Sequence, residues 1–438
     1  MLIRAMIRVV VVSVFLIASL FGSTTPCIAS EPEEVTIYHP VTWEDGLHLL
    51  PVTQWIPKTS SPEAQVRGAV ELLMNLNSNP LGEAQLLRVA VDSQGVTLDF
   101  SRELTERNLG AFGEQVTVQA IVQTALGTGH PGPVQLLIEG DRQKTLAGHV
   151  SISSPLDPDL TVLWQGYPDL HGHWAERQIL AASLGDIVRG QRSTTFAPEA
   201  LMDRGTFIVA LIAANPPFIQ TGYPDEGWIF GDPFEDVNPG TELGRAVRMA
   251  SAAGYLQASD DAIPTHLNPE QPITRAEAMV MATRSAGGQD RARALALLAG
   301  DREDARMVGY IGAAREMNIL RGYPDGSLRL DDPVTRAEAV ALIVRASGLC
   351  PDHGGTALVR PTPGGTLFRG EPMIGVTARR DADRIVYQLH EDSGELLSQG
   401  KIEVQERGWF AFCPALPPAE GPAHLTVDGK RMPLLLEP

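Results

Sequence analysis

The chain has 438 residues, 43% of them hydrophobic, which suits about three domains of roughly 150 residues and excludes a disordered or fibrous polymer. The sum of Lys and Arg is 35 against 53 Asp and Glu, and the resulting formal charge of -18 argues against a nucleic-acid-binding surface. The three cysteines, Cys27, Cys350 and Cys413, are too few for a disulfide-rich scaffold or a four-cysteine metal site.

Residues 1–29 predict a signal peptide. Arg4 and Arg8 precede an apolar run over residues 9–21, which is too short to span a bilayer comfortably, and small residues then favour cleavage after Ala29. An uncleaved anchor and lipid attachment at Cys27 are the alternatives. No other apolar run approaches membrane length, so we expect a secreted protein with no membrane span after signal cleavage.

Residues 35–155 predict a two-layer α/β domain. Strand patterns cover residues 35–38 and 47–56, and a helix opens at Ser61-Pro62 and runs to about residue 76. A hairpin over residues 87–100, a second amphipathic helix around residues 118–125 and a strand over residues 134–138 follow. The order is β-β-α-β-β-α-β, with both helices expected on one face of a single sheet.

This stretch resembles the GerMN domain of sporulation and spore germination proteins. The resemblance rests on the opening "VTIYHP", the helix "PEAQVRGAVELLMNLNSNP", the hairpin "LRVAVDSQGVTLDFSREL", the segment "VTVQAIVQTAL" and the strand "PVQLLIEG". The resemblance implies a non-catalytic domain that acts through protein or wall contacts.

Residues 160–348 contain an internal repeat of helix, loop and helix. The first and last units place a glycine, an apolar residue and an arginine at the same spacing: Gly190, Phe196 and Arg204, and Gly322, Leu328 and Arg336. The middle unit aligns through Leu267 and Arg275. Because an isolated unit of this size buries little surface, three units are expected to pack as one all-α body.

The repeat resembles three S-layer homology (SLH) modules, at about residues 160–215, 230–287 and 300–348. The resemblance rests on "YPDLHGHWAERQILAASLGDIVRG", on "FEDVNPG" with "LNPEQPITRAEAMVMATR", and on "GYPDGSLRLDDPVTRAEAVALIVR". It implies a three-module bundle whose grooves bind anionic, pyruvylated secondary cell-wall polysaccharide, and hence a location at the cell wall or cell surface.

The helix starts of the three units predict capping by side chains. Thr274 with Glu277, and Thr335 with Glu338, fit capping boxes, in which the threonine accepts one backbone amide and the glutamate another. In the first unit Asp203 can still cap, but the glutamate is absent.

Capping does not explain the arginine that follows each cap. A cation in the first helical turn faces the positive end of the helix dipole, at a cost of about 0.3–1 kcal/mol. With free amides nearby, Arg275 and Arg336 would form a site for a carboxylate or phosphate, and Arg204 occupies the same position in the first unit. A purely structural salt bridge is the alternative.

Only the first unit has a His173-Trp174 pair. Trp174 could stack on a sugar face, and core packing is the other interpretation. The predicted polysaccharide site therefore comprises Arg204, Arg275, Arg336 and Trp174, with one or two of the grooves active.

Residues 349–365 are expected to be a linker and residues 366–438 an all-β sandwich. Short alternating runs separated by turns support the sandwich. The sequences "PTPGGTL", "IVYQLHEDSGELLSQG" and "GWFAF" resemble the immunoglobulin-like domain that accompanies GerMN in germination proteins. A disulfide between Cys350 and Cys413 is an open alternative to two free thiols.

Motifs for catalysis, metals and cofactors are weak. The glycines of residues 127–132 follow a helix and enter a strand, which is the reverse of a dinucleotide-binding context. No nucleophile elbow, P-loop or zinc-protease motif occurs. We therefore expect no cofactor, no metal and no catalytic residue.

The favoured hypothesis is a non-catalytic envelope protein that the SLH modules attach to secondary cell-wall polysaccharide. The GerMN-like domain would make sporulation, germination or envelope-assembly contacts, with peptidoglycan or envelope proteins as candidate partners and no nucleic acid. One alternative is a wall-lytic enzyme that the modules target to its substrate. Another is that the modules contact an outer membrane or an S-layer neighbour instead of wall sugar.

Overall fold

The computed structural model describes most of the chain after the predicted signal peptide. The described residues are 32–43, 46–76, 79–130, 132–164, 166–191, 195–217, 234–256, 265–300, 302–349, 355–361, 365–368, 370–377, 384–405, 408–414, 416 and 420–437. The predicted signal peptide, Cys27 and Cys350 lie outside them. No helix of the described part is long and apolar enough to cross a membrane.

The N-terminal α/β unit has the predicted order of elements. They are β1 (Glu33–Trp43), β2 (Gly46–Ile56), α2 (Pro62–Met74), β3 (Leu86–Asp92), β4 (Gly95–Phe100), α3 (Gly110–Leu126) and β5 (Val134–Ile138). Helix α2 begins where Pro62 predicts, since the Ser61 side chain accepts a hydrogen bond from the Ala64 amide at 3.2 Å.

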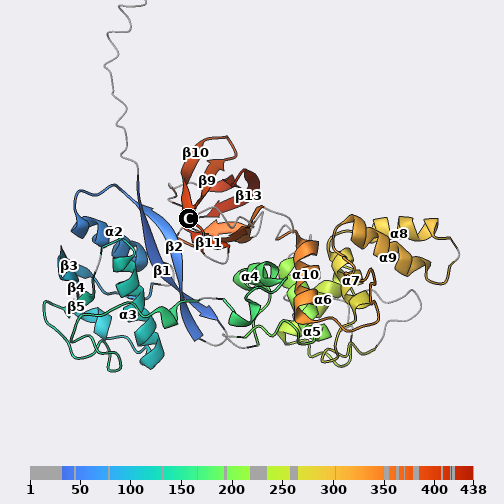
Figure 1. Ribbon diagram of the computed structural model, residues 1–438, viewed down its shortest axis with the longest axis horizontal. Coiled ribbons are helices and arrows are strands. Elements are labelled where there is room, and N and C mark those ends of the chain that lie inside the picture. The colour runs from blue at the N-terminus through green and yellow to red at the C-terminus, as the bar shows by residue number, and fades with distance from the viewer. Residues whose placement is uncertain are drawn as a thin grey trace, which may run out of the picture.

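The strands of this unit fall into two sheets, so the expectation of a single sheet is wrong. β3, β4 and β5 form a three-stranded sheet, while the β1–β2 hairpin belongs to a five-stranded sheet of order β1-β2-β11-β8-β6. The free edge of β2 pairs with a C-terminal strand, and the Cys413 amide donates to the Thr53 carbonyl at 3.0 Å. Helix α3 contacts strands of both sheets, which explains why it is buried on almost every side (Figure 1).

Buried polar side chains of α3 hold the segment that leaves this unit. The fully buried Glu114 carboxylate accepts backbone hydrogen bonds from Ala147, His149 and Val150, at 2.8–3.3 Å. The Gln123 amide donates to the Asp159 carbonyl at 2.9 Å. These bonds satisfy groups that burial would otherwise leave unpaired, and they fix the path toward the next region.

Helices dominate residues 160–348, which we call the repeat region. They are α4 (Glu176–Leu184), α5 (Arg204–Ala214), α6 (Glu242–Ala252), α7 (Arg275–Ser285), α8 (Gln289–Leu298), α9 (Ala305–Glu316) and α10 (Arg336–Ser347). Helices α4 and α5, α6 and α7, and α9 and α10 correspond to the three predicted units. Helix α8 lies between the second and third predicted units and packs against α9 at the end of the molecule (Figure 1).

Equivalent loops of the three units share the same unusual backbone. Ala197, Asn268 and Arg329 occupy one loop position, and all three have positive φ values of 59°, 52° and 48°. Non-glycine residues adopt this conformation rarely, so its recurrence at one position indicates a true structural repeat.

The C-terminal region is built from strands. They are β6 (Thr356–Arg360), β7 (Thr366–Phe368), β8 (Met373–Thr377), β9 (Arg384–Glu391), β10 (Leu396–Glu403), β11 (Trp409–Phe412), β12 (Gly421–Val427) and β13 (Lys430–Glu437). One sheet has the order β10-β9-β12-β13-β7, and β11, β8 and β6 join the N-terminal hairpin in the other. Strand β6 lies within residues 349–365, so the expectation that this whole segment is a linker is wrong.

Cys413 of this region is a free, buried thiol. Burial raises the pKa of Cys413 to about 12, so the thiol is protonated and unreactive at neutral pH.

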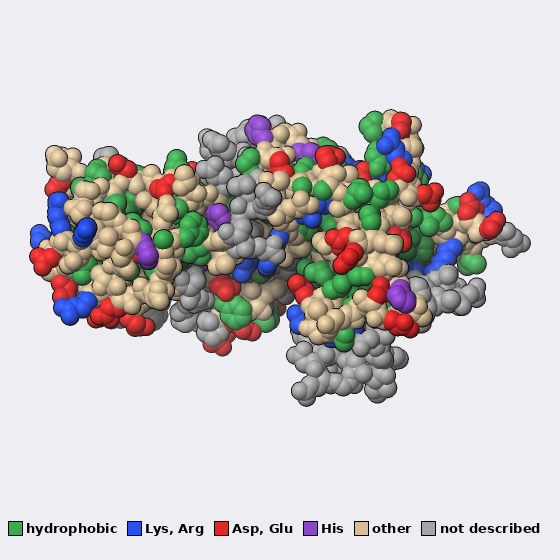
Figure 2. Space-filling model, turned by 90° about the horizontal axis from the view of Figure 1, so that it is seen from below, with side chains coloured by type: hydrophobic (Ala, Val, Ile, Leu, Met, Phe, Trp, Pro, Cys, Tyr) green, Lys and Arg blue, Asp and Glu red, His purple; other side chains and the backbone are tan. Residues whose placement is uncertain are grey.

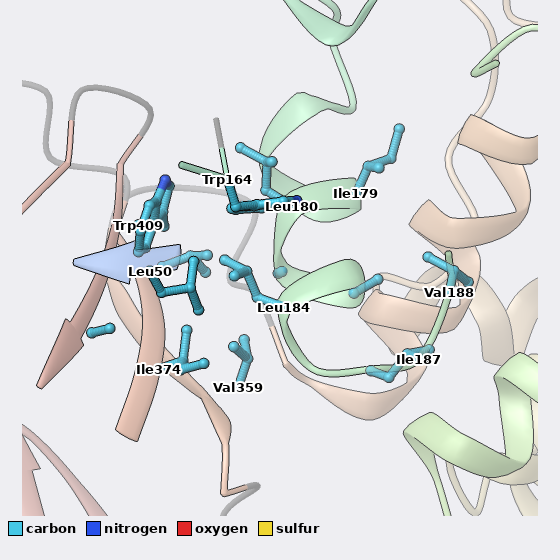
Figure 3. Packing of buried hydrophobic residues seen from close by; sticks show 14 of the residues in the cluster. Leu50, Trp164, Ile179, Leu180, Leu184, Ile187, Val188, Val359, Ile374 and Trp409 are labelled. Atoms are coloured by element: carbon cyan, nitrogen blue, oxygen red, sulfur yellow. The ribbon is translucent and has the colours of Figure 1, made fainter. Parts of the chain in front are cut away.

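An apolar junction joins the N-terminal unit, the repeat region and the C-terminal strands. The rings of Trp164 and Trp409 pack edge to face with centroids 5.7 Å apart. Leu50 of β2, Leu184 of α4 and Ile374 of β8 lie beside them, each at most 3% exposed (Figure 3).

Candidate functional site

The three helix starts of the repeat region are capped by side chains. Asp203 accepts a hydrogen bond from the Thr206 amide at 2.7 Å, and capping boxes join Thr274 with Glu277 and Thr335 with Glu338. The backbone angles of the three capping residues agree to within 5°. The caps therefore place three arginines in equivalent positions.

A closed ring of backbone hydrogen bonds connects the residues just before the caps. The Met202 amide donates to Val334, the Val334 amide to Ile273, and the Ile273 amide to Met202, each at 3.0 Å. Each helix start thus pairs with both others, and the repeat region has an approximate threefold arrangement around this ring.

The amides of the first helical turn are not free, so the expectation of an anion site made from them is wrong. The Arg275 and Ala276 amides donate to the carbonyls of Asp332 and Leu330 at 2.9 and 2.8 Å. The Arg336 amide donates to the Ala200 carbonyl at 2.7 Å. The loop of the next unit therefore satisfies the orphan donors that an anion would otherwise bind.

Two of the arginine side chains pair with the glutamate of the next unit. Arg204 donates to Glu277 at 2.8 Å, and a nitrogen of Arg275 lies 3.5 Å from Glu338. Arg275 is only 7% exposed and also stacks on the ring of Tyr323, 4.7 Å from its centroid. This geometry is that of the structural salt bridge, the alternative weighed for these residues.

Arg336 is buried, but no described glutamate of the neighbouring unit pairs with it. It is 8% exposed, donates to the carbonyls of Phe196 and Arg189 at 3.1 and 2.6 Å, and lies 4.6 Å from the centroid of the Phe196 ring. The position equivalent to Glu277 and Glu338 is Thr206 in the first unit. Burial lowers the pKa of Arg336, while the charges of Asp203 and Asp169 oppose that shift.

Trp174 is 55% exposed, so it is not a core residue. Its ring lies 5.5 Å from that of His173, which contacts Glu199 at 3.0 Å. Trp174 is therefore open to solvent on the first unit.

An open cavity of about 610 Å³ lies between the second and third units, and we call it the unit 2–3 groove. Its floor and rim combine apolar, aromatic and charged side chains: Arg204, Phe234, Tyr255, Leu256, His266, Leu267, Ala276, Glu277, Val280, Met281, Arg284, Glu303, Asp304, Arg306, Met307 and Tyr310. Of the predicted binding arginines, the groove includes Arg204 but neither Arg275 nor Arg336.

Arg306 is the exposed cation of the groove. Its guanidinium has no hydrogen bond or ion pair with any residue that the structure describes. Of the acids in the lining, Glu277 and Asp304 are paired with Arg204 and Arg302, while the exposed Glu303 has no ion pair among the described residues. On the face shown in Figure 2, acidic and basic side chains are interspersed, so an anion would have to bind through local groups such as this one.

Two buried tyrosines of the groove are fixed by Arg284. Its guanidinium donates to the Tyr310 hydroxyl at 2.8 Å and to the Tyr255 carbonyl at 3.2 Å. The groove thus combines an aromatic wall, an unpaired cation and polar rim groups, which can contact a ring face and an anionic group.

Sequence reasoning missed Arg306, Tyr255 and Tyr310. They lie outside the Thr-Arg-Ala-Glu motif, and only the packing of α9 against α7 brings them together with Arg204.

In the described part of the chain, no three His, Cys, Asp or Glu side chains are grouped in a way that could hold a metal ion.

Comparison with known proteins identifies two domains. Residues 36–144 match the Germane family, described as "Sporulation and spore germination", and residues 302–340 match the S-layer homology domain. The middle cell wall protein of Brevibacillus brevis is 34% identical over 90 residues, which are 20% of this chain and only 8% of that protein.

Two solved structures are similar to parts of the chain. The tandem GerMN domains of the sporulation protein GerM from Bacillus subtilis match 30% of this chain and 46% of that chain, with 19% identity and a TM-score of 0.24. A protein from Clostridium perfringens matches 28% of this chain and 87% of that chain, with 16% identity and a TM-score of 0.21.

Proposed function

We propose that this protein is a secreted, non-catalytic component of the cell envelope, attached to the cell wall through secondary cell-wall polysaccharide. Residues 160–348 act as three SLH modules in this proposal, and the C-terminal strands act as an immunoglobulin-like domain. The Germane domain makes sporulation, germination or envelope-assembly contacts, with peptidoglycan or envelope proteins as partners.

The observation that carries the proposal is the threefold ring of helix starts. Only residues 302–340 match the S-layer homology domain, but the first and second units share the capped helix start, the positive-φ loop residue and the cyclic hydrogen bonds of that third unit. Three equivalent units around one ring support the interpretation that all three are SLH modules. The partial match to a cell wall protein supports the same location.

The unit 2–3 groove is the proposed binding site for the polysaccharide. Arg306 binds the carboxylate of the anionic sugar, Arg204 and His266 line the same site, and Tyr255 and Tyr310 form its wall. In this proposal the buried Arg275 and Arg336 join the units instead of touching the polymer. Trp174 offers a second, separate surface for a sugar ring.

A sedimentation assay with the full secreted chain tests the proposal. The protein should pellet with native cell walls and stay in solution with walls from which the secondary polymer has been stripped. Equal pelleting with both preparations would remove the polymer from the proposal. Release of new reducing ends or free amines from peptidoglycan would show that the protein is a wall-lytic enzyme instead.

A further inference from the structure

A second cavity, of about 380 Å³, lies where the three parts of the protein meet, and we call it the junction cavity. Its lining comes from β1, β2, the end of α4 and the turn after it, the end of β6, the segment before β8, and β8 itself: His39, Pro40, Val41, Thr42, Leu50, Ser183, Leu184, Asp186, Arg360, Gly370, Glu371, Pro372 and Ile374. It shares no residue with the unit 2–3 groove. Its size and its place between domains are typical of small-molecule sites.

One side of the junction cavity is apolar and rigid. Leu50, Leu184 and Ile374 belong to the packed core at the junction, and each is at most 3% exposed (Figure 3). A ligand's apolar side chain could be desolvated against this surface without any rearrangement of the core.

Two opposite charges in the lining lack a partner. The exposed Arg360 guanidinium and the half-buried Glu371 carboxylate make no hydrogen bond or ion pair with each other, or with any other side chain the structure describes. Asp186, by contrast, is paired with Arg189 at 3.0 Å. The cavity therefore presents one cation and one anion that are both available to a ligand.

His39, Thr42 and Ser183 are the neutral polar side chains of the lining. The Ser183 hydroxyl is fully buried and has no hydrogen-bond partner, although a helical serine can usually bond the carbonyl one turn earlier. Burial lowers the pKa of His39, and the charge of Arg360 acts in the same direction while the Pro40 carbonyl opposes it. The ring is therefore neutral at neutral pH, and its Nδ1 lies 2.9 Å from that carbonyl, which leaves Nε2 as an acceptor.

We propose that the junction cavity binds a small zwitterion of amino-acid size with an apolar side chain. The ligand carboxylate pairs with Arg360, its ammonium group pairs with Glu371, and its side chain packs on Leu50, Leu184 and Ile374. This site is independent of wall attachment, so either proposal can fail without the other.

Isothermal titration of the full secreted chain with L-leucine tests the proposal. Leucine should bind with a Kd below about 1 mM, a modest affinity for a ligand this small. Two probes each lack one charge: 4-methylpentanoate has no ammonium group and 3-methylbutylamine has no carboxylate. Each should bind at least about tenfold more weakly, because one ion pair is lost. No binding of leucine, or equal binding of either probe, would overturn the proposal.

Two variants test which charged group of the ligand each side chain binds. Arg360→Gln and Glu371→Gln should each weaken leucine binding by about tenfold. Arg360→Gln should leave the binding of 3-methylbutylamine unchanged, and Glu371→Gln should leave that of 4-methylpentanoate unchanged. Arg88→Gln and Glu395→Gln make the same charge changes at exposed positions outside the cavity and should bind leucine like the wild type. If Arg360→Gln and Glu371→Gln also bind leucine like the wild type, the proposed contacts of the ligand with Arg360 and Glu371 are wrong.

Discussion

At the scale of single residues, the arginine after each cap acts as a connector between units. Arg204 reaches Glu277 of the second unit, and Arg275 reaches Glu338 of the third. Each glutamate also caps its own helix, so one carboxylate serves two units. The charge of these arginines is therefore used inside the protein.

The two ion pairs differ in burial, and we expect their removal to have different costs. Side-chain exposures are 8% and 16% for Arg275 and Glu338, against 15% and 38% for Arg204 and Glu277. Glutamine can still cap the helix but carries no charge. Glu338→Gln should lower the free energy of unfolding by roughly 2 kcal/mol because it leaves a buried cation uncompensated, and Glu277→Gln by less than about 1 kcal/mol. Urea denaturation measures both, and equal losses would contradict this ranking.

At Arg336 a carboxylate can be added instead of removed, because the first unit has no glutamate at the position equivalent to Glu277 and Glu338. Thr206→Glu should place a carboxylate beside it and raise the free energy of unfolding by about 0.5–1 kcal/mol at neutral pH. The new carboxyl would have a folded pKa below its unfolded value of about 4.3, so the gain should be complete well above that pH and lost as pH falls through the folded pKa. Thr206→Gln is the uncharged control, and an equal gain with glutamine would show that the charge is not responsible.

The sequence predicts the caps but not the partners of the arginines. A cap joins residues three positions apart, such as Thr274 and Glu277, so its pattern is visible along the chain. Arg336 instead bonds the carbonyl of Arg189, which is 147 positions away. Spacing in the sequence carries no information on such a distant contact. For the same reason the sequence predicts free backbone amides in the first turn of each helix, although carbonyls in the loop of the next unit accept their hydrogen bonds.

At the scale of elements, α9 contributes Arg306, Met307 and Tyr310 to the unit 2–3 groove, and α8 packs against α9. The helices approach closely at Gly309, where an added Cβ would lie 2.2 Å from the Ala292 carbonyl oxygen. At Gly312 the added Cβ would lie 2.8 Å from the end of the flexible Leu295 side chain. Only the first contact is with backbone.

We therefore expect Gly309→Ala to be far more disruptive than Gly312→Ala. The first should lower the free energy of unfolding by about 1–3 kcal/mol because α8 and α9 must separate, while the second should cost less than about 1 kcal/mol because Leu295 can rotate. Thermal or urea unfolding of the two variants measures the difference. Similar losses would contradict the close backbone approach of the two helices.

The order of elements in the N-terminal unit was predictable because each strand and helix has its own periodicity. The division of its strands into two sheets was not, because the partner of β2 is β11, more than three hundred residues later in the chain. Helix α8 was missed because a single buried residue, Ala292, leaves it without a clear apolar stripe.

At the scale of the whole molecule, the two ends of the chain share one sheet. The β1–β2 hairpin is completed by β11, β8 and β6, and Trp409 of β11 packs on Trp164 at the entry to the repeat region. The predicted division into three separate domains therefore underestimates how the first and last regions depend on each other.

Trp409→Ala should loosen this shared sheet. Trp409 is 4% exposed, and its loss should lower the stability of the junction by about 3–5 kcal/mol. Hydrogen exchange should accelerate in β2, over residues 46–56, while residues 86–100 of the separate three-stranded sheet serve as an internal control. Unchanged exchange in β2 would contradict the coupling of the two ends.

In the proposed function, the unit 2–3 groove holds an anionic wall polysaccharide through Arg306. The most direct test is a titration of purified secondary polymer into the wild type, Arg306→Gln and Arg315→Gln. Arg315 lies nine residues further along α9, on its opposite face, so it makes the same charge change away from the groove. Arg306→Gln should weaken binding by about tenfold, or about 1.4 kcal/mol, and Arg315→Gln should bind like the wild type. Equal affinity of all three proteins would contradict the claim.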